Sequence, residues 1–257
     1  MHFLELVWHT LWFLAVGLHG LLTFVAMRRG FQRLFPVFVC YTTWITLEGI
    51  ILIYMYYAPS VSGNEYAVAS ITTLAICAAA RFAVVYEIFK HLLDRYPALS
   101  GSGTFLFRLV TVALLGAVIV LAKFSPPAGS DPLMATVFAL QTAVNIVLVG
   151  LLLFVFVFSG FFRLSWRSHV FGIALGLGIF GTVSLSTSAI RAQLQPIVPN
   201  QMTKLTEAIN QGTYVVCALI WLVYLLATER PPQSPKPRLP KHDLGAWNQE
   251  LQRFLHR

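Results

Sequence analysis

Seven long apolar runs dominate the sequence and limit what the chain can fold into. Each run is close to the roughly 20 apolar residues that an α-helix needs to cross a bilayer. Only 11% of the 257 residues are charged, whereas a soluble domain usually carries about 25%. We therefore predict an all-α integral membrane protein, a bundle of seven transmembrane helices. The predicted spans are Phe3–Met27, Pro36–Ala58, Tyr66–Leu93, Phe105–Phe124, Met134–Phe162, Val170–Ile190 and Ala208–Ala227.

Basic residues are concentrated in alternate loops and in the C-terminal tail. Loop 28–35 has Arg28, Arg29 and Arg33, loop 163–169 has Arg163 and Arg167, and Lys90, Arg95 and Arg108 lie in or beside loop 94–104. Loops 59–65 and 125–133 have no basic residue, and loop 191–207 has Arg191 and Lys204. By the positive-inside rule, the N-terminus is outside and the C-terminus is cytoplasmic. We expect a multi-pass protein of the cytoplasmic (inner) membrane. The net charge of +8 then reflects topology and contact with anionic lipid, and no nucleic-acid partner is expected.

The chain divides by composition into three parts. The seven-helix transmembrane domain is expected to cover residues 1–228. Residues 229–242 contain five prolines, which predicts a stiff cytoplasmic linker. Residues 243–257 predict a short amphipathic helix, with Asp243 as its N-cap and apolar side chains on one face. Such a helix can lie on the inner leaflet or dock on a partner protein.

Two charged residues fall deep inside neighbouring spans. Glu48 in the second span and Arg81 in the third both lie about 18 Å from the inner end, at 1.5 Å per residue. An ionisable side chain at that depth costs several kcal/mol unless it is paired or hydrated. The sequence therefore predicts a buried Glu48–Arg81 ion pair. It is interpreted either as a structural staple or as a pair that opens when a ligand or proton arrives.

A second pair of titratable residues lies nearer the inner face. His19 and Glu87 are at similar depth, which suggests a proton or ion relay between the first and third spans. Two other interpretations remain open. Glu87 can form a local ion pair with Lys90 and His91, which follow on the same helical face. His19 can be a hydrogen-bonded packing residue.

A third group of polar residues occupies the outer half of the later spans. Uncharged amides in membrane helices often bond across the bundle, and the group is compatible with that interpretation. It is also compatible with a pocket, because ligand sites combine apolar walls with a few convergent polar groups. The candidate outer ligand pocket comprises Gln141, Asn145, Arg191, Asn210, Gln211 and Tyr214.

Catalytic and cofactor-binding motifs are missing from the sequence. It contains no HExxH, GxSxG, P-loop or GxGxxG pattern. The three cysteines lie singly in apolar runs, where buried packing positions are expected. We therefore predict a non-enzymatic protein without a metal or cofactor. Asp94-Arg95-Tyr96 matches the triplet of G-protein-coupled receptors, but the seventh span lacks that family's Asn-Pro-x-x-Tyr and also lacks the lysine of retinal proteins.

Three short stretches carry a resemblance to a known group of proteins. They are Arg28-Arg29 after the first span, Arg33-Leu-Phe-Pro36 at the start of the second, and Arg81-Phe-Ala-Val-Val-Tyr-Glu-Ile-Phe89 in the third. In these stretches the chain resembles uncharacterised bacterial seven-transmembrane-helix proteins, some of which resemble the membrane sensor regions of histidine kinases. The resemblance implies the seven-helix fold and a sensing role.

Three functions are compatible with the sequence. A receptor or sensor module would bind a small ligand from the outer face and signal through a partner, and it predicts one outer pocket. A small-solute transporter with a midplane Glu48–Arg81 site predicts a cavity that reaches these residues from either side. An accessory subunit of a larger membrane complex predicts no pocket. A partner protein or a second copy would bind through the Gly172/Gly176 face or the C-terminal helix.

Overall fold

The computed structural model describes residues 2–93, 141–150, 168–194 and 199–227, together with Leu153 and Gln252. These residues form helices and short connections, and no strand occurs among them. The helices are α1 (His2–Arg28), the 3-10 helix η1 (Phe31–Arg33), α2 (Pro36–Tyr57), α3 (Gly63–Leu93), α6 (His169–Leu194) and α7 (Pro199–Leu226). A further helical segment covers Gln141–Gly150.

Five of these helices, α1, α2, α3, α6 and α7, are long and apolar enough to cross a membrane. The chain is therefore a polytopic membrane protein. The predicted fourth span, 105–124, lies outside the described residues, as does most of the fifth. The chain divides into two units, Met1–Ala227 and Thr228–Arg257. The expected linker 229–242 and amphipathic helix 243–257 fall in the second unit and, apart from Gln252, outside the described residues.

The observed helix limits follow the apolar runs closely, except at the start of α7. That helix begins at Pro199, nine residues before the predicted start at Ala208. The sequence predicts a loop over 191–207. Residues 199–207 are helical, and Lys204 on α7 forms an ion pair with Glu5 on α1. Polar residues at the end of a membrane helix can thus belong to the helix when a neighbouring helix supplies their partners.

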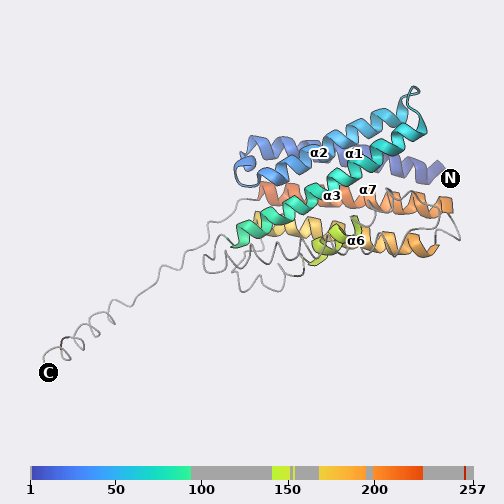
Figure 1. Ribbon diagram of the computed structural model, residues 1–257. Helices are drawn as coiled ribbons and strands as arrows, with labels where there is room; N and C mark the ends of the chain where they lie inside the picture. Colours follow the sequence, from blue (N-terminus) through green and yellow to red (C-terminus); the bar gives the residue numbers. More distant parts are fainter. Residues whose placement is uncertain are drawn as a thin grey trace. The chain divides into compact units, whose positions relative to one another are not determined.

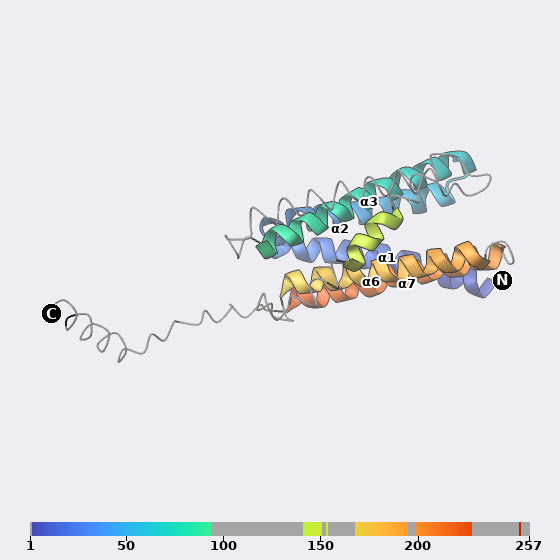
Figure 2. The same cartoon turned by 60° about the horizontal axis from the view of Figure 1, so that its bottom comes forward.

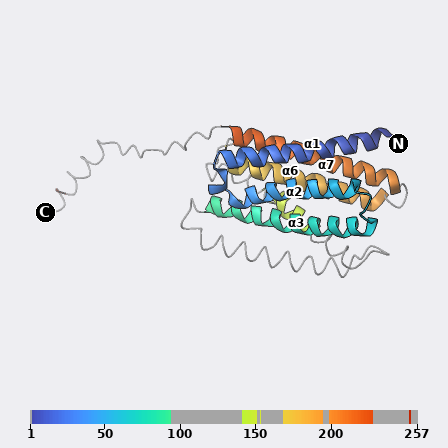
Figure 3. The same ribbon diagram turned by 90° about the horizontal axis from the view of Figure 1, so that it is seen from above.

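The five long helices form a closed ring in the first unit. α1 contacts α2 on one side and α7 on the other, α2 contacts α3, α6 contacts α7, and α3 touches α6. Figures 1 and 3 show the helices running side by side. Figure 2 shows α2 and α3 forming one layer and α6 and α7 another, with the helical segment 141–150 between α3 and α6.

The α1–α2 connection marks one end of the bundle, which we call the basic end because Arg28, Arg29 and Arg33 lie there. Gly30 makes the turn with a φ of 69°, a left-handed conformation that favours glycine. Arg29 Nη1 donates hydrogen bonds to the carbonyl oxygens of Leu225 and Leu226, at 2.9 and 3.3 Å. An arginine suits the carbonyl-rich C-terminus of a helix, so Arg29 ties α7 to the α1–α2 connection.

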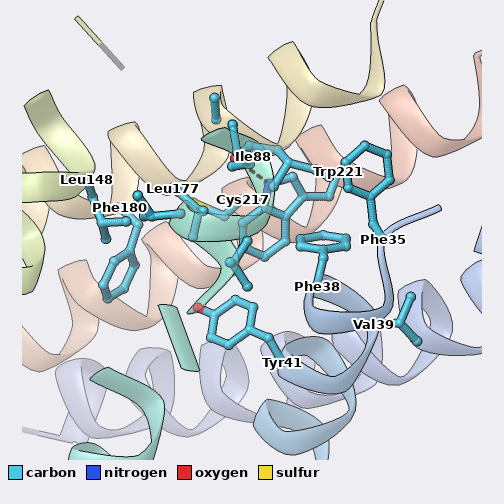
Figure 4. Packing of buried hydrophobic residues seen from close by; sticks show 14 of the residues in the cluster. Phe35, Phe38, Val39, Tyr41, Ile88, Leu148, Leu177, Phe180, Cys217 and Trp221 are labelled. Carbon is cyan, nitrogen blue, oxygen red and sulfur yellow. Dashed lines mark hydrogen bonds between the residues drawn. The ribbon is translucent and has the colours of Figure 1, made fainter. Parts of the chain in front are cut away.

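Aromatic side chains fill the half of the ring nearer the basic end. The rings of Phe38 on α2 and Trp221 on α7 meet edge to face with centroids 5.2 Å apart, as Figure 4 shows. Phe35 and Tyr41 are buried beside them. Edge-to-face contact adds to the free energy gained from burying aromatic surface. This half of the bundle is therefore tightly packed.

Gly172 and Gly176 of α6 face α7 of the same chain. A Cβ atom at Gly172 would lie 2.2 Å from Cγ of Tyr224, and one at Gly176 would lie 2.2 Å from Nε1 of Trp221. The sequence-based hypothesis that the Gly172/Gly176 face receives a partner or a second copy is therefore wrong. The small residues do permit close helix contact, but the helix that they admit is α7.

Candidate functional site

A cavity of about 280 Å³ lies inside the ring, in the half away from the basic end. Every long helix contributes to its walls: residues 12–19 of α1, 45–52 of α2, 70–74 of α3, 180–184 of α6 and 207–214 of α7. Its polar lining consists of His19, Glu48, Ser70, Gln141, Ser184, Glu207, Asn210, Gln211 and Tyr214. The end of the cavity away from the basic end is lined by Glu207, which is exposed. The end nearer the basic end meets the half of the bundle that is packed with aromatic side chains.

Four of the six residues predicted for the outer pocket line this cavity, namely Gln141, Asn210, Gln211 and Tyr214. Asn145 is buried behind the wall, where its Nδ2 donates to Ser184 Oγ at 2.8 Å. Asn145 therefore forms a hydrogen bond between helices, which was the alternative to a role in ligand binding. The side chain of Arg191 lies outside the described residues. The sequence thus grouped four of the nine polar lining residues.

Glu48 and Arg81 do not form the predicted ion pair. Both residues are described, and no hydrogen bond or salt bridge joins them. Oε2 of Glu48 accepts a hydrogen bond from the thiol of Cys77 at 2.7 Å, and Cys77 lies one helical turn before Arg81. Distance from the span ends does not give the register between α2 and α3, which the hydrogen bonds to Glu87 define. Glu87 lies opposite Val37, so Arg81 faces a level about one turn nearer the basic end than Glu48.

Arg81 is instead bound by aromatic residues from three helices. Its Nε donates to the hydroxyl of Tyr41 on α2 at 3.2 Å, and its Nη2 donates to the hydroxyl of Tyr214 on α7. Its guanidinium carbon lies 4.1 Å from the ring centroid of Phe180 on α6, a cation–π contact. Arg81 is fully buried. Since Tyr214 lines the cavity, Arg81 connects the cavity floor to the packed half of the bundle.

His19 and Glu87 are both described, and no hydrogen bond or salt bridge links them. They therefore do not form the predicted relay by direct contact. Glu87 accepts hydrogen bonds from the backbone N–H groups of Val37 and Phe38, both at 2.9 Å. These are unpaired donors in the first turn of α2, where a carboxylate also complements the helix dipole. Glu87 thus caps α2 from α3. His19 packs edge-on against Tyr214 and Trp221 and lines the cavity.

The cysteines divide between the interior and the surface. Cys77 and Cys217 are buried, as predicted, and the thiol of Cys217 donates to the carbonyl oxygen of Gly176 at 3.1 Å. Cys40 is exposed, so the prediction of a buried position is wrong there. Its apolar run has both a buried face and an exposed face, and Cys40 lies on the exposed one. Apolar sequence alone does not separate lipid contact from core contact.

No protein-family model, curated protein or solved structure matches this chain. Its function must therefore be argued from the chemistry of the cavity.

Sequence reasoning missed that Glu48 and His19 share one cavity with the amides of α7. A periodic signal was present. Glu207, Asn210, Gln211 and Tyr214 recur at three- and four-residue spacing, which places them on one face of α7. Ser70, Cys77 and Arg81 follow a similar stripe on α3. Two polar stripes on membrane helices indicate an interior polar space, and these stripes converge here.

The arrangement is suited to binding through hydrogen bonds, charge and aromatic contact. Residues with carboxylate, amide, hydroxyl and imidazole groups line one cavity, together with the aromatic residues Trp12, Phe180 and Tyr214. Among the described residues, no group of three or more His, Cys, Asp or Glu side chains is placed to hold a metal ion. The cavity has the mixture of apolar walls and few polar groups that is typical of small-molecule sites.

Proposed function

We propose that this chain is a non-enzymatic membrane receptor or sensor module that binds a small ligand in the central cavity. The observation that carries the proposal is the position of the cavity. It is lined by all five long helices in the half away from the basic end, whereas aromatic side chains fill the other half. If the basic end is cytoplasmic, as the distribution of arginine and lysine predicts, the ligand enters from outside.

Arg81 supplies a physical route from the ligand to the rest of the protein. A ligand that moves Tyr214 changes the hydrogen bond that this tyrosine accepts from Arg81. Arg81 also holds Tyr41, which belongs to the packed core of the basic half. Packed cores respond to such changes by switching between discrete arrangements. The expected output is a changed surface at the basic end, which a partner protein would recognise.

A small-solute transporter is the second candidate, because Glu48 lines the cavity. Transport requires a second opening toward the basic end, and that half is filled by residues such as Phe38 and Trp221. A transporter would therefore have to separate these aromatic rings in part of its cycle. An accessory subunit needs no cavity, so the cavity favours a ligand-binding role over a purely structural one.

The proposal predicts that a small molecule accompanies the protein when it is extracted gently from its native membrane. Native mass spectrometry should detect that molecule on the wild type and on Ile76→Trp, because Ile76 is exposed outside the cavity. Leu74→Trp should lose it, because Leu74 lines the cavity and the larger side chain occupies the space.

Two results would count against this account. Equal retention by Leu74→Trp and Ile76→Trp would show that the molecule binds elsewhere. Protein subunits in fixed ratio, with no small molecule on the wild type, would favour the accessory role. Uptake of a retained molecule into proteoliposomes would favour the transporter.

A further inference from the structure

We infer that the central cavity selects a small organic cation, a protonated amine attached to an apolar body. The inference rests on the proposed function, since it names the chemical class of ligand for the same cavity. Three features carry it: the charge of the cavity wall, an unpartnered buried nitrogen on His19, and the aromatic walls.

The charged residues that line the cavity are acidic. Glu48 on α2 and Glu207 on α7 contribute carboxylates, and none of the described lining residues is a lysine or arginine. Two cations of the described helices have partners of their own. Lys204 pairs with Glu5, and Arg81 lies behind Tyr214 and Phe180. Carboxylates attract cations and repel anions at close range, so the wall favours a cation and opposes an anion.

His19 adds a hydrogen-bond acceptor that has no partner. Its Nδ1 lies 2.8 Å from the carbonyl oxygen of Ala15. A carbonyl accepts hydrogen bonds only, so Nδ1 carries the proton of the neutral ring and Nε2 presents a lone pair. Nε2 is buried without a partner, and His19 lines the cavity. A buried polar group left unpaired is costly, so a ligand N–H that reached Nε2 would be stabilised.

Aromatic residues complete a site of the right size for such a ligand. Trp12, Phe180 and Tyr214 contribute to three different walls. Aromatic faces attract ammonium groups through cation–π contact and also pack against an apolar body. The volume of 280 Å³ equals that of about nine water molecules in the liquid. One observation points the other way, because Nη1 of Arg81 is also buried without a partner. An anion that reached Arg81 would use it.

Three probes of similar size and different charge separate these possibilities. Phenethylamine, phenethyl alcohol and phenylacetate are each titrated into the wild-type protein in lipid nanodiscs, with calorimetry and the thermal midpoint as readouts. We expect phenethylamine to bind at least tenfold more tightly than either of the others and to raise the thermal midpoint. Tightest binding by phenylacetate would overturn the inference in favour of Arg81. Equal binding by the amine and the alcohol would show that charge is not recognised.

Matched carboxylate variants then test where the cation binds. Glu48→Gln and Glu207→Gln should each weaken phenethylamine binding at least tenfold. Glu65→Gln is the control, because Glu65 lies outside the cavity and caps the start of α3 together with Ser62, a role that glutamine retains. Thermal midpoints without ligand identify any variant that misfolds, and Glu207, being exposed, tolerates substitution.

Different results would overturn the proposed ligand class and the proposed function. If phenethylamine does not bind the wild type, or if the Glu48 and Glu207 variants bind it as well as Glu65→Gln does, the cation inference is overturned. The proposed function is then judged by whether Leu74→Trp loses the co-purifying molecule. If that molecule is lost and is neutral or anionic, the cavity is a ligand site of another class.

Discussion

Replacing Arg81 with alanine is expected to destabilise the bundle more than replacing any other charged residue of the described helices. The substitution leaves the buried hydroxyls of Tyr41 and Tyr214 without their donor and removes the cation over Phe180. Unpaired buried groups and the space left by the side chain together cost about 3 kcal/mol, after allowing for relief of the buried charge. That corresponds to a fall of about 6–12 °C in the thermal midpoint.

Three comparisons make this result informative. Arg28→Ala should change the midpoint little, because Arg28 is exposed and its guanidinium lies over the ring of Phe24, which is itself exposed. Glu87→Ala should lower it by less than Arg81→Ala, because the lost cap is worth about 0.5–2 kcal/mol. Arg81→Lys should rescue part of the loss, since an ammonium cannot match the planar fork that reaches both tyrosines. Equal midpoints for Arg81→Ala and Arg28→Ala would contradict the central role of Arg81.

Replacing Gly176 with alanine is expected to produce the second large loss. The added Cβ would lie 2.2 Å from Nε1 and 2.7 Å from Cε2 of Trp221. The indole is held in place, because it is buried and donates to the carbonyl oxygen of Ile173 at 3.3 Å. α6 and α7 must therefore separate or the ring must leave its site. Overpacking of this kind costs about 1–3 kcal/mol or more, measurable as a lower thermal midpoint in detergent.

Gly17 provides the matched control for this substitution. It lies in the middle of α1, and a Cβ atom added there would meet nothing within 4 Å. Gly17→Ala should leave the midpoint unchanged or raise it slightly, because alanine is favoured over glycine in helices by about 0.5–1 kcal/mol. Equal behaviour of the two variants would show that the α6–α7 contact is looser than the structure indicates.

The helices were predictable because each apolar run must be long enough to cross the bilayer. The positions of α1, α2 and α3 follow from this requirement to within a few residues. The start of α7 did not, because the polar segment before Ala208 has its partner on α1 at Glu5. A residue that is paired by a distant part of the chain carries no local signal of that pairing.

The cavity was only partly predictable for the same reason. The amides of α7 are visible in the sequence as a polar stripe, and they do line the cavity. The partners of Arg81 were not visible, because matching charges by depth required the register between α2 and α3. That register is set by Glu87, which caps the start of α2. It shifts Arg81 away from Glu48 by about one helical turn.

The most direct test of the central claim is chemical access to the cavity from one side of the membrane. Cysteine is introduced at Gln211, which lines the cavity, or at Arg33, which lies at the basic end. The native cysteines are replaced, with serine at position 77 so that Glu48 keeps a donor. Intact cells are then treated with a membrane-impermeant maleimide.

The account predicts that the cysteine at position 211 is labelled in intact cells, whereas the cysteine at position 33 is labelled only after permeabilisation. Phenethylamine should slow labelling at position 211 by occupying the cavity. Labelling of position 33 but not of position 211 in intact cells would contradict the account, because the cavity would then face the cytoplasm.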